Sequence, residues 1–121
     1  MDIFSGSQSP GWLLETASIR KLYGLLTEQG AVAYNLLVNS GHDFDLYYQN
    51  LGHQFKQQTL SIPVEGYENR IVYGFRQPPP RRDMSYYIEH AMAMADVQAI
   101  DYGEVLSTIY TTNPVGSGII Y

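Results

Sequence analysis

Residues 83–101 read DMSYYIEHAMAMADVQAID, and they predict one long helix around which the rest of the chain is organised. Asp83 follows the prolines at 78–80 and is a suitable N-cap, because its side chain can accept a hydrogen bond from a backbone N–H of the first turn. Apolar residues then recur at intervals of three and four, which builds one apolar face: Met84, Ile88, Ala91, Met92, Ala95 and Ala99. The alanines allow another backbone to approach this face closely.

Two amphipathic patterns precede this stretch. The first begins with Ser9 as N-cap and Pro10 as first helical residue, ends at Gly30, and carries its apolar residues on one side: Trp12, Ile19, Leu22, Tyr23 and Leu26. The second begins at Asp43, a predicted N-cap, and continues through Phe44, Tyr47, Tyr48, Leu51 and Phe55. The run 31–38 between them is apolar almost throughout and too short to classify by its period, so we predict a buried helix, with a strand as the alternative.

Alternating apolar residues predict a β-hairpin. One arm holds Leu60, Ile62 and Val64, the other holds Ile71, Tyr73 and Phe75, and residues 65–69 form the turn. Pro63 places the first strand at a sheet edge or near its own end, since proline has no N–H to donate. Residues 105–112 are rich in β-branched and aromatic side chains and provide a candidate third strand.

The length of 121 residues fits one domain. We therefore expect a small α+β domain over 12–112 with about three helices, the β-hairpin and the candidate third strand. Extended arms flank it, an N-terminal arm over 1–11 and a C-terminal arm over 113–121. Both arms are rich in Gly, Ser and Pro and carry isolated apolar residues that are expected to dock on the same domain or on a neighbour.

Composition narrows the classes of partner. The net charge of −5 opposes binding to a phosphate backbone, and no apolar run reaches the roughly 18 residues of a membrane span. The start of the chain lacks the basic residues of a signal peptide, so we expect a protein that is cytoplasmic at synthesis. Tyrosine, at 11 residues, far outnumbers lysine, present only as Lys21 and Lys56, and this bias is typical of protein interfaces.

Few residues suggest chemistry. His42, Asp43 and Asp45 could hold a divalent metal if His53 or His90 came near, but a capping role explains Asp43 more simply. Neither a phosphate-binding glycine loop nor a nucleophile elbow is present. We accordingly expect no catalytic residues, no metal and no cofactor.

The leading hypothesis is a non-enzymatic structural subunit that forms homo-oligomers or docks into a larger protein complex. Its predicted partner-binding residues are apolar groups of the arms and aromatic groups of the domain: Phe4, Trp12, Tyr48, Tyr86, Ile119, Ile120 and Tyr121. In general character, a small acidic subunit with extended arms resembles the head-to-tail connector, adaptor and decoration proteins of bacteriophage particles, which implies a place in a virion. This resemblance covers no diagnostic motif and transfers no functional residue.

Two other hypotheses remain open. One is a small metal-dependent or acid–base enzyme that uses His42, Asp45 and His90, which requires these residues to converge in a pocket. The other is a ligand-binding module in which tyrosines such as Tyr48 serve as stacking platforms.

Overall fold

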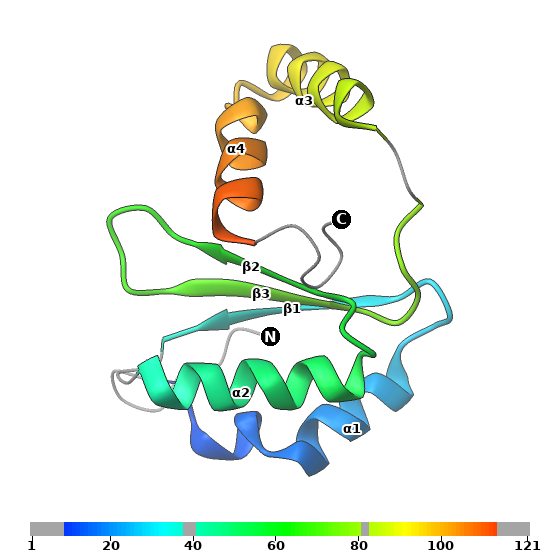
Figure 1. The fold of residues 1–121 in the computed structure, drawn as a ribbon, viewed down its shortest axis with the longest axis vertical. Coiled ribbons are helices and arrows are strands. Elements are labelled where there is room, and N and C mark those ends of the chain that lie inside the picture. Colours follow the sequence, from blue (N-terminus) through cyan, green and yellow to red (C-terminus); the bar gives the residue numbers. More distant parts are fainter. Residues whose placement is uncertain (1–8, 38–40, 81–82, 114–121) are drawn as a thin grey trace.

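The computed structural model describes residues 9–37, 41–80 and 83–113, and it combines helices with one small antiparallel sheet (Figure 1). In chain order the elements are the 3-10 helix η1 (Gly11–Leu14), α1 (Thr16–Leu25), β1 (Ala31–Leu36), α2 (Gly41–Gln54), β2 (Thr59–Pro63), β3 (Arg70–Phe75), α3 (Met84–Gln98) and α4 (Tyr102–Thr112). The predicted α+β class is confirmed. Phe4, Ile119, Ile120 and Tyr121 of the predicted arms lie outside the described residues.

The sheet has the strand order β1-β3-β2, with both pairs antiparallel. The predicted hairpin is therefore confirmed as β2 and β3, whose register pairs Ser61 with Val72 and Ile62 with Ile71. Pro63 is the last residue of β2, and β2 is an edge strand. Both positions suit proline, because it has no N–H to donate to a neighbouring strand.

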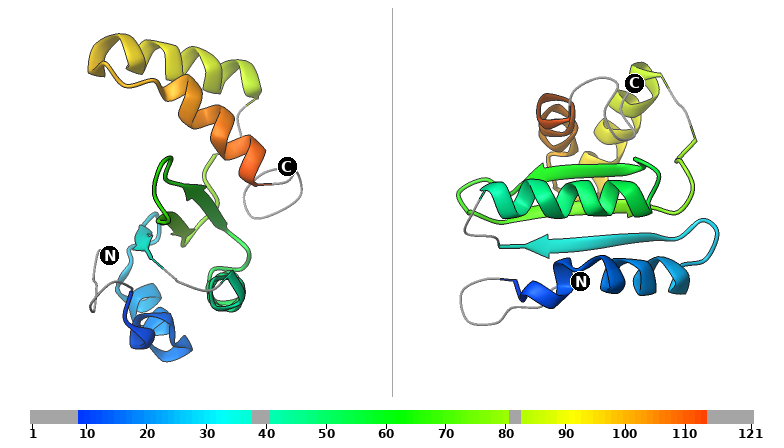
Figure 2. Two further views of the ribbon diagram at one scale, coloured as in Figure 1. Left: turned by 90° about the vertical axis from the view of Figure 1, so that its left-hand side faces the viewer. Right: turned by 60° about the horizontal axis from the view of Figure 1, so that its bottom comes forward.

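One face of the sheet carries the core. Val32, Tyr34 and Leu36 of β1 and Val72 of β3 point to the same side, where α1 and α2 lie (Figure 2). They pack there against buried residues of η1, α1, α2 and the end of α2: Leu13, Ile19, Tyr47, Leu51 and Phe55. The Phe55 ring packs on the sheet at Gly74, where a Cβ would lie 3.0 Å from three ring atoms, so any larger residue would require the ring to shift.

The buried-helix prediction for residues 31–38 is wrong, and the strand alternative is correct. Residues Ala31–Leu36 pair with β3, and their side chains alternate between exposed and buried. A short apolar run can form a strand when another strand pairs with it. Here the partner β3 lies about forty residues later in the chain, so local periodicity could not indicate the pairing.

Helix ends also differ from the prediction. The first helix is interrupted at Glu15, whose extended backbone separates η1 from α1, and α1 ends at Leu25 rather than at Gly30. Ser9 does not cap it: its N–H donates to the Leu37 oxygen and its Oγ accepts from the Leu37 N–H. Asp43 is not an N-cap either, because α2 already begins at Gly41 and Asp43 lies in its first turn.

The predicted strand over residues 105–112 is wrong, because this segment forms α4. Asp101 caps the helix by accepting a hydrogen bond from the Glu104 N–H. Apolar side chains also recur at helical spacing along it, at Tyr102, Val105, Leu106, Ile109 and Tyr110. A good N-cap and this spacing outweigh the β-propensity of the individual residues.

The helical hairpin α3–α4 is joined to the sheet through Asn113, directly after α4. Its Oδ1 accepts from the Ser61 N–H at 3.0 Å, and its Nδ2 donates to the Ser61 oxygen at 2.8 Å. The same Nδ2 also donates to the Ile109 oxygen, which ties the pairing to the last turn of α4. Asn113 and Ser61 are both buried, so this amide replaces the missing neighbour strand at the edge of β2.

We predict that Asn113→Ala lowers the free energy of unfolding by about 3 kcal/mol, because it leaves the buried N–H and C=O of Ser61 without partners. Thr111→Ala is the matched control: it removes an exposed hydrogen bond to Ser107 within the same helix and should cost less than about 0.5 kcal/mol. Urea denaturation followed by circular dichroism measures both. Equal costs for the two variants would contradict the bridging role of Asn113.

Candidate functional site

The α3–α4 hairpin carries the largest group of exposed apolar side chains among the described residues. α4 rises from the sheet at β2, and α3 lies beyond it, on the side opposite α1 and α2 (Figure 1, Figure 2). The exposed residues, which we call the hairpin surface, are Met84, Ile88, Met92, Val97, Ile100 and Val105. Met92 is 64% and Val97 84% exposed, so neither is covered by the helix beside it.

The distribution of side chains around α3 explains this exposure. At about 100° per residue, Ser85, Glu89 and Asp96 fall within a polar sector of only about 40°. Met84, Ile88 and Met92 line one border of that sector, and Val97 lies beyond the other border. The apolar arc is thus too wide for one neighbouring helix to cover, and α4 is the element against which α3 packs.

The hairpin has no core of its own. In α3 the single buried residue is Ala91, and in α4 no residue is buried. Tyr87, Met94 and Ala95 border Ala91 and are half-buried. By contrast, α2 buries Tyr47 and Leu51 completely. Because the contact between α3 and α4 consists mainly of half-buried side chains, it removes less apolar surface from water than the packing of α1 and α2 on the sheet does.

Local interactions fix the shape of the hairpin instead. Asp83 accepts from the Tyr86 N–H at 2.9 Å, which confirms the predicted N-cap. α3 ends at Gln98, three residues before the predicted end, because Ala99 takes a left-handed conformation with φ of 56°. The Tyr102 hydroxyl then donates to the Gln98 side chain and ties the two helices at their junction. The hairpin surface is therefore presented on a defined scaffold.

The hairpin is also uniformly acidic. Residues 83–113 contain the carboxylates Asp83, Glu89, Asp96, Asp101 and Glu104 and no lysine or arginine. Among them Glu89 and Asp96 lie in the polar sector next to Met92. A partner that covers the apolar side chains would meet these carboxylates at the rim of the contact, where complementary charge favours association.

The predicted aromatic contact residues fall in different places. Trp12 on η1 is 50% exposed, and Tyr86 on α3 is 46% exposed and stacks on His90 at 5.8 Å. Tyr48 on α2 is half-buried and stacks on Phe44, and the Arg70 guanidinium lies over the Phe44 ring. The three residues do not form one patch, since they belong to elements on both sides of the sheet. Sequence reasoning missed Met92, Val97 and Ile100, although their helical spacing beside a narrow polar sector was readable.

Two residues of the histidine hypothesis, Asp45 and His90, are not brought together, and the side chain of His42 lies outside the described part of the structure. Asp45 is exposed on α2 and His90 is exposed on α3, and these helices lie on opposite sides of the sheet (Figure 1). Among the residues that the structure describes, no group of three or more His, Asp or Glu side chains could hold a metal ion. In the same ranges, no helix is both long and apolar enough to cross a bilayer.

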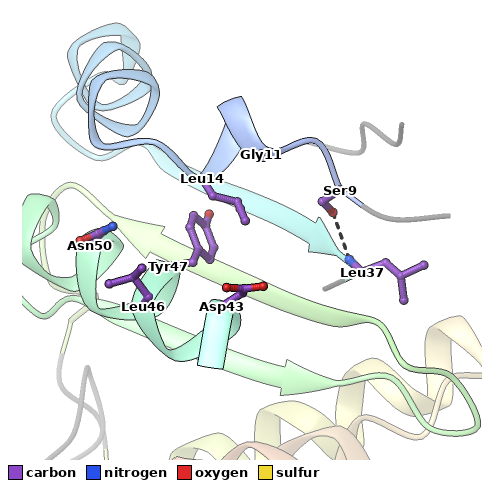
Figure 3. Close-up of a pocket in the computed structure, with 8 residues that line it drawn as sticks. All are labelled: Ser9, Gly11, Leu14, Leu37, Asp43, Leu46, Tyr47 and Asn50. Atoms are coloured by element: carbon purple, nitrogen blue, oxygen red, sulfur yellow. Dashed lines mark hydrogen bonds between the residues drawn. The ribbon is translucent and has the colours of Figure 1, made fainter. Parts of the chain in front are cut away.

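A cavity of about 330 Å³ lies between η1 and α2 (Figure 3). Its lining mixes apolar and polar residues: Ser9, Gly11, Leu14, Leu37, Asp43, Leu46, Tyr47 and Asn50. Ser9 is already engaged with Leu37, and the Tyr47 hydroxyl is fully enclosed. The polar groups with which a small molecule in this cavity could form hydrogen bonds are therefore chiefly the carboxylate of Asp43 and the amide of Asn50.

Behind this cavity, Tyr34 and Tyr47 meet edge to face with their ring centroids 5.6 Å apart. Burial raises the pKa of both phenols above the ordinary value of 10.0, and for Tyr47 the neighbouring Tyr34 raises it further. The hydroxyls are close enough to affect each other's ionisation, yet neither forms a hydrogen bond of ordinary geometry within the described residues. Both phenols consequently resist ionisation in the folded state.

A comparison of the chain with protein-family models, curated proteins and solved structures found no match. The function of the chain is therefore inferred from its fold and from the chemistry of its surface.

We predict that stability falls at high pH through these two tyrosines. Because the folded-state pKa of each phenol is raised, the free energy of unfolding is unaffected by these tyrosines below pH 10. Above pH 10 the unfolded chain loses phenol protons that the folded chain keeps, and unfolding becomes more favourable. Each buried tyrosine should then lower the free energy of unfolding by about 1.4 kcal/mol per pH unit. Tyr47→Phe should reduce this slope, whereas Tyr67→Phe, at a side chain 75% exposed, should not change it. Urea denaturation between pH 8 and 11.5 measures the slopes, and an unchanged slope in Tyr47→Phe would contradict the assignment.

Proposed function

We propose that this chain is a non-enzymatic structural subunit that docks into a larger protein assembly through the hairpin surface. The observation that carries the proposal is the combination of six exposed large apolar side chains with a hairpin in which Ala91 is the single buried residue. Groups of exposed apolar side chains bordered by polar residues are typical of protein interaction sites. Methionines at two of the six positions suit such a surface, because their flexible side chains adapt to a partner.

The free energy gained by covering the hairpin surface is small. Covering the partly exposed hairpin surface contributes about 1 kcal/mol per side chain, or on the order of 6 kcal/mol in total. Association costs at least about 4 kcal/mol in lost translational and rotational freedom. The hairpin surface alone therefore gives weak binding, and we propose that the apolar ends of the two arms, which include Phe4 and Ile119, supply the remaining contacts.

A bacteriophage particle is one assembly in which such a subunit would serve, as a head-to-tail connector, adaptor or decoration protein. The support for this finer proposal is the general character of the chain, which is small, acidic and rich in Gly and Ser at both ends. The docking role itself does not depend on it.

Photo-cross-linking from the hairpin tests the docking role. With benzoylphenylalanine in place of Met92, illumination of the cells that naturally make the protein should give discrete adducts to one or a few proteins. Gln49, an exposed residue of α2 outside the hairpin, is the control position and should give few. Adducts from Met92 that are no more abundant or defined than those from Gln49 would refute a docking role for the hairpin surface.

A further inference from the structure

The outward face of α1 is the opposite of the hairpin in charge. Arg20 and Lys21 are the charged residues of α1, and both are exposed. They project from the side of the helix away from Ile19, which is buried in the core. Ala17 and Gly24 lie on the same outward side, and Leu25 next to them is 81% exposed. This combination, which we call the α1 face, is basic, shallow and partly apolar.

The shallow part of the α1 face can accept a helix. A Cβ built on Gly24 would meet no atom within 4 Å, and the side chain of Ala17 is only a methyl group. The backbone of a partner helix can therefore come close to α1 between Arg20 and Lys21. Small residues at a contact allow this approach because no side chain holds the backbones apart. The exposed Leu25 adds an apolar contact at one end.

The remaining cations of the described residues are less suited to receive an acidic partner. Arg70 is held over the Phe44 ring and Arg76 over the Tyr23 ring. Arg76 also donates to the Leu26 oxygen. Lys56 is exposed but isolated at the end of α2. Positive charge on an open helix face is thus concentrated at Arg20 and Lys21.

The hairpin and the α1 face cannot meet within one molecule. α1 lies below one face of the sheet, and the hairpin lies on the other side (Figure 1, Figure 2). Two hairpin surfaces are also poor partners for each other, because Glu89 and Asp96 of one copy would face the same two carboxylates of the other. Such like-charge contacts disfavour association. The charge pattern points to the α1 face of another copy.

On the basis of the proposed docking role, we propose that the hairpin surface docks on the α1 face of a second copy of this chain, so that copies associate head to tail. Met84, Ile88 and Met92 lie over Ala17, Gly24 and Leu25, and the adjoining Glu89 and Asp96 meet Arg20 and Lys21. Each copy offers one hairpin and one α1 face, so the contact is heterologous. It closes into a ring if its rotation permits and otherwise extends as a filament.

Charge reversal tests this contact. Wild-type protein should show a mass by light scattering that rises with concentration up to about 1 mM. The variant Arg20→Glu/Lys21→Glu and the variant Glu89→Lys/Asp96→Lys should each raise the dissociation constant about tenfold or more. Lys56→Glu, an exposed reversal outside both surfaces, should leave it unchanged, and circular dichroism checks that every variant is folded.

An equimolar mixture of the two double variants gives the decisive result. In the mixture each acidic hairpin finds a basic α1 face and each basic hairpin finds an acidic one, so association should return to the wild-type level. Wild-type association in Arg20→Glu/Lys21→Glu alone, failure of the mixture to associate, or a wild-type monomer at all concentrations would overturn head-to-tail docking. Cross-links from Met92 to a different protein, combined with a monomeric chain, would retain the docking role and overturn only the identity of the partner.

Discussion

The arrangement of the molecule depends on one side-chain amide, that of Asn113, paired with both backbone groups of Ser61. An edge strand leaves its outward N–H and C=O groups open, and in β2 Pro63 removes one donor while Asn113 satisfies the pair at Ser61. Because the amide also bonds to Ile109 in the last turn of α4, a single buried residue both closes the sheet edge and orients the hairpin. Together with the packing of α4 on β2 and of α3 on α4, this pairing sets the position of the hairpin.

The two sides of the sheet consequently have different energetic roles. On one side α1 and α2 bury aromatic and aliphatic residues such as Tyr34, Tyr47 and Phe55, and this core accounts for the stability of the domain. On the other side α3 and α4 are capped, turn at Ala99 and are anchored at Asn113, yet Ala91 is their single buried residue and several of their large apolar side chains are exposed. A hairpin held in place by polar contacts and left without a core is suited to completing its packing on another protein. This division of roles is the physical basis for the proposed assembly function.

The sequence predicts those features that depend on neighbouring residues. Local rules predict the N-cap at Asp83, the β-hairpin that turns at residues 65–69 and the position of Pro63 at a strand end. All three are present in the structure. The helix prediction for residues 31–38 is wrong, because an apolar run of that length has no period and its partner strand β3 is distant in sequence. Residues 105–112 were misassigned because β-branched composition was given more weight than spacing and the Asp101 cap. The Asn113–Ser61 pairing spans 52 residues and has no local signal at all. The spacing of the hairpin surface, by contrast, is visible in the sequence, but the sequence does not indicate whether another element of the same chain covers it.

The central claim is that the α3–α4 hairpin is incomplete in the isolated chain and is completed by association. Native-state hydrogen exchange, read by mass spectrometry at several protein concentrations, tests it most directly. We expect amides of α3 to exchange much faster in dilute solution than those of β3 and α2, and protection of α3 to rise with concentration or with bound partner while β3 stays constant. Protection of α3 equal to that of β3 in the dilute monomer would contradict this claim, because the hairpin would then be stable without any partner.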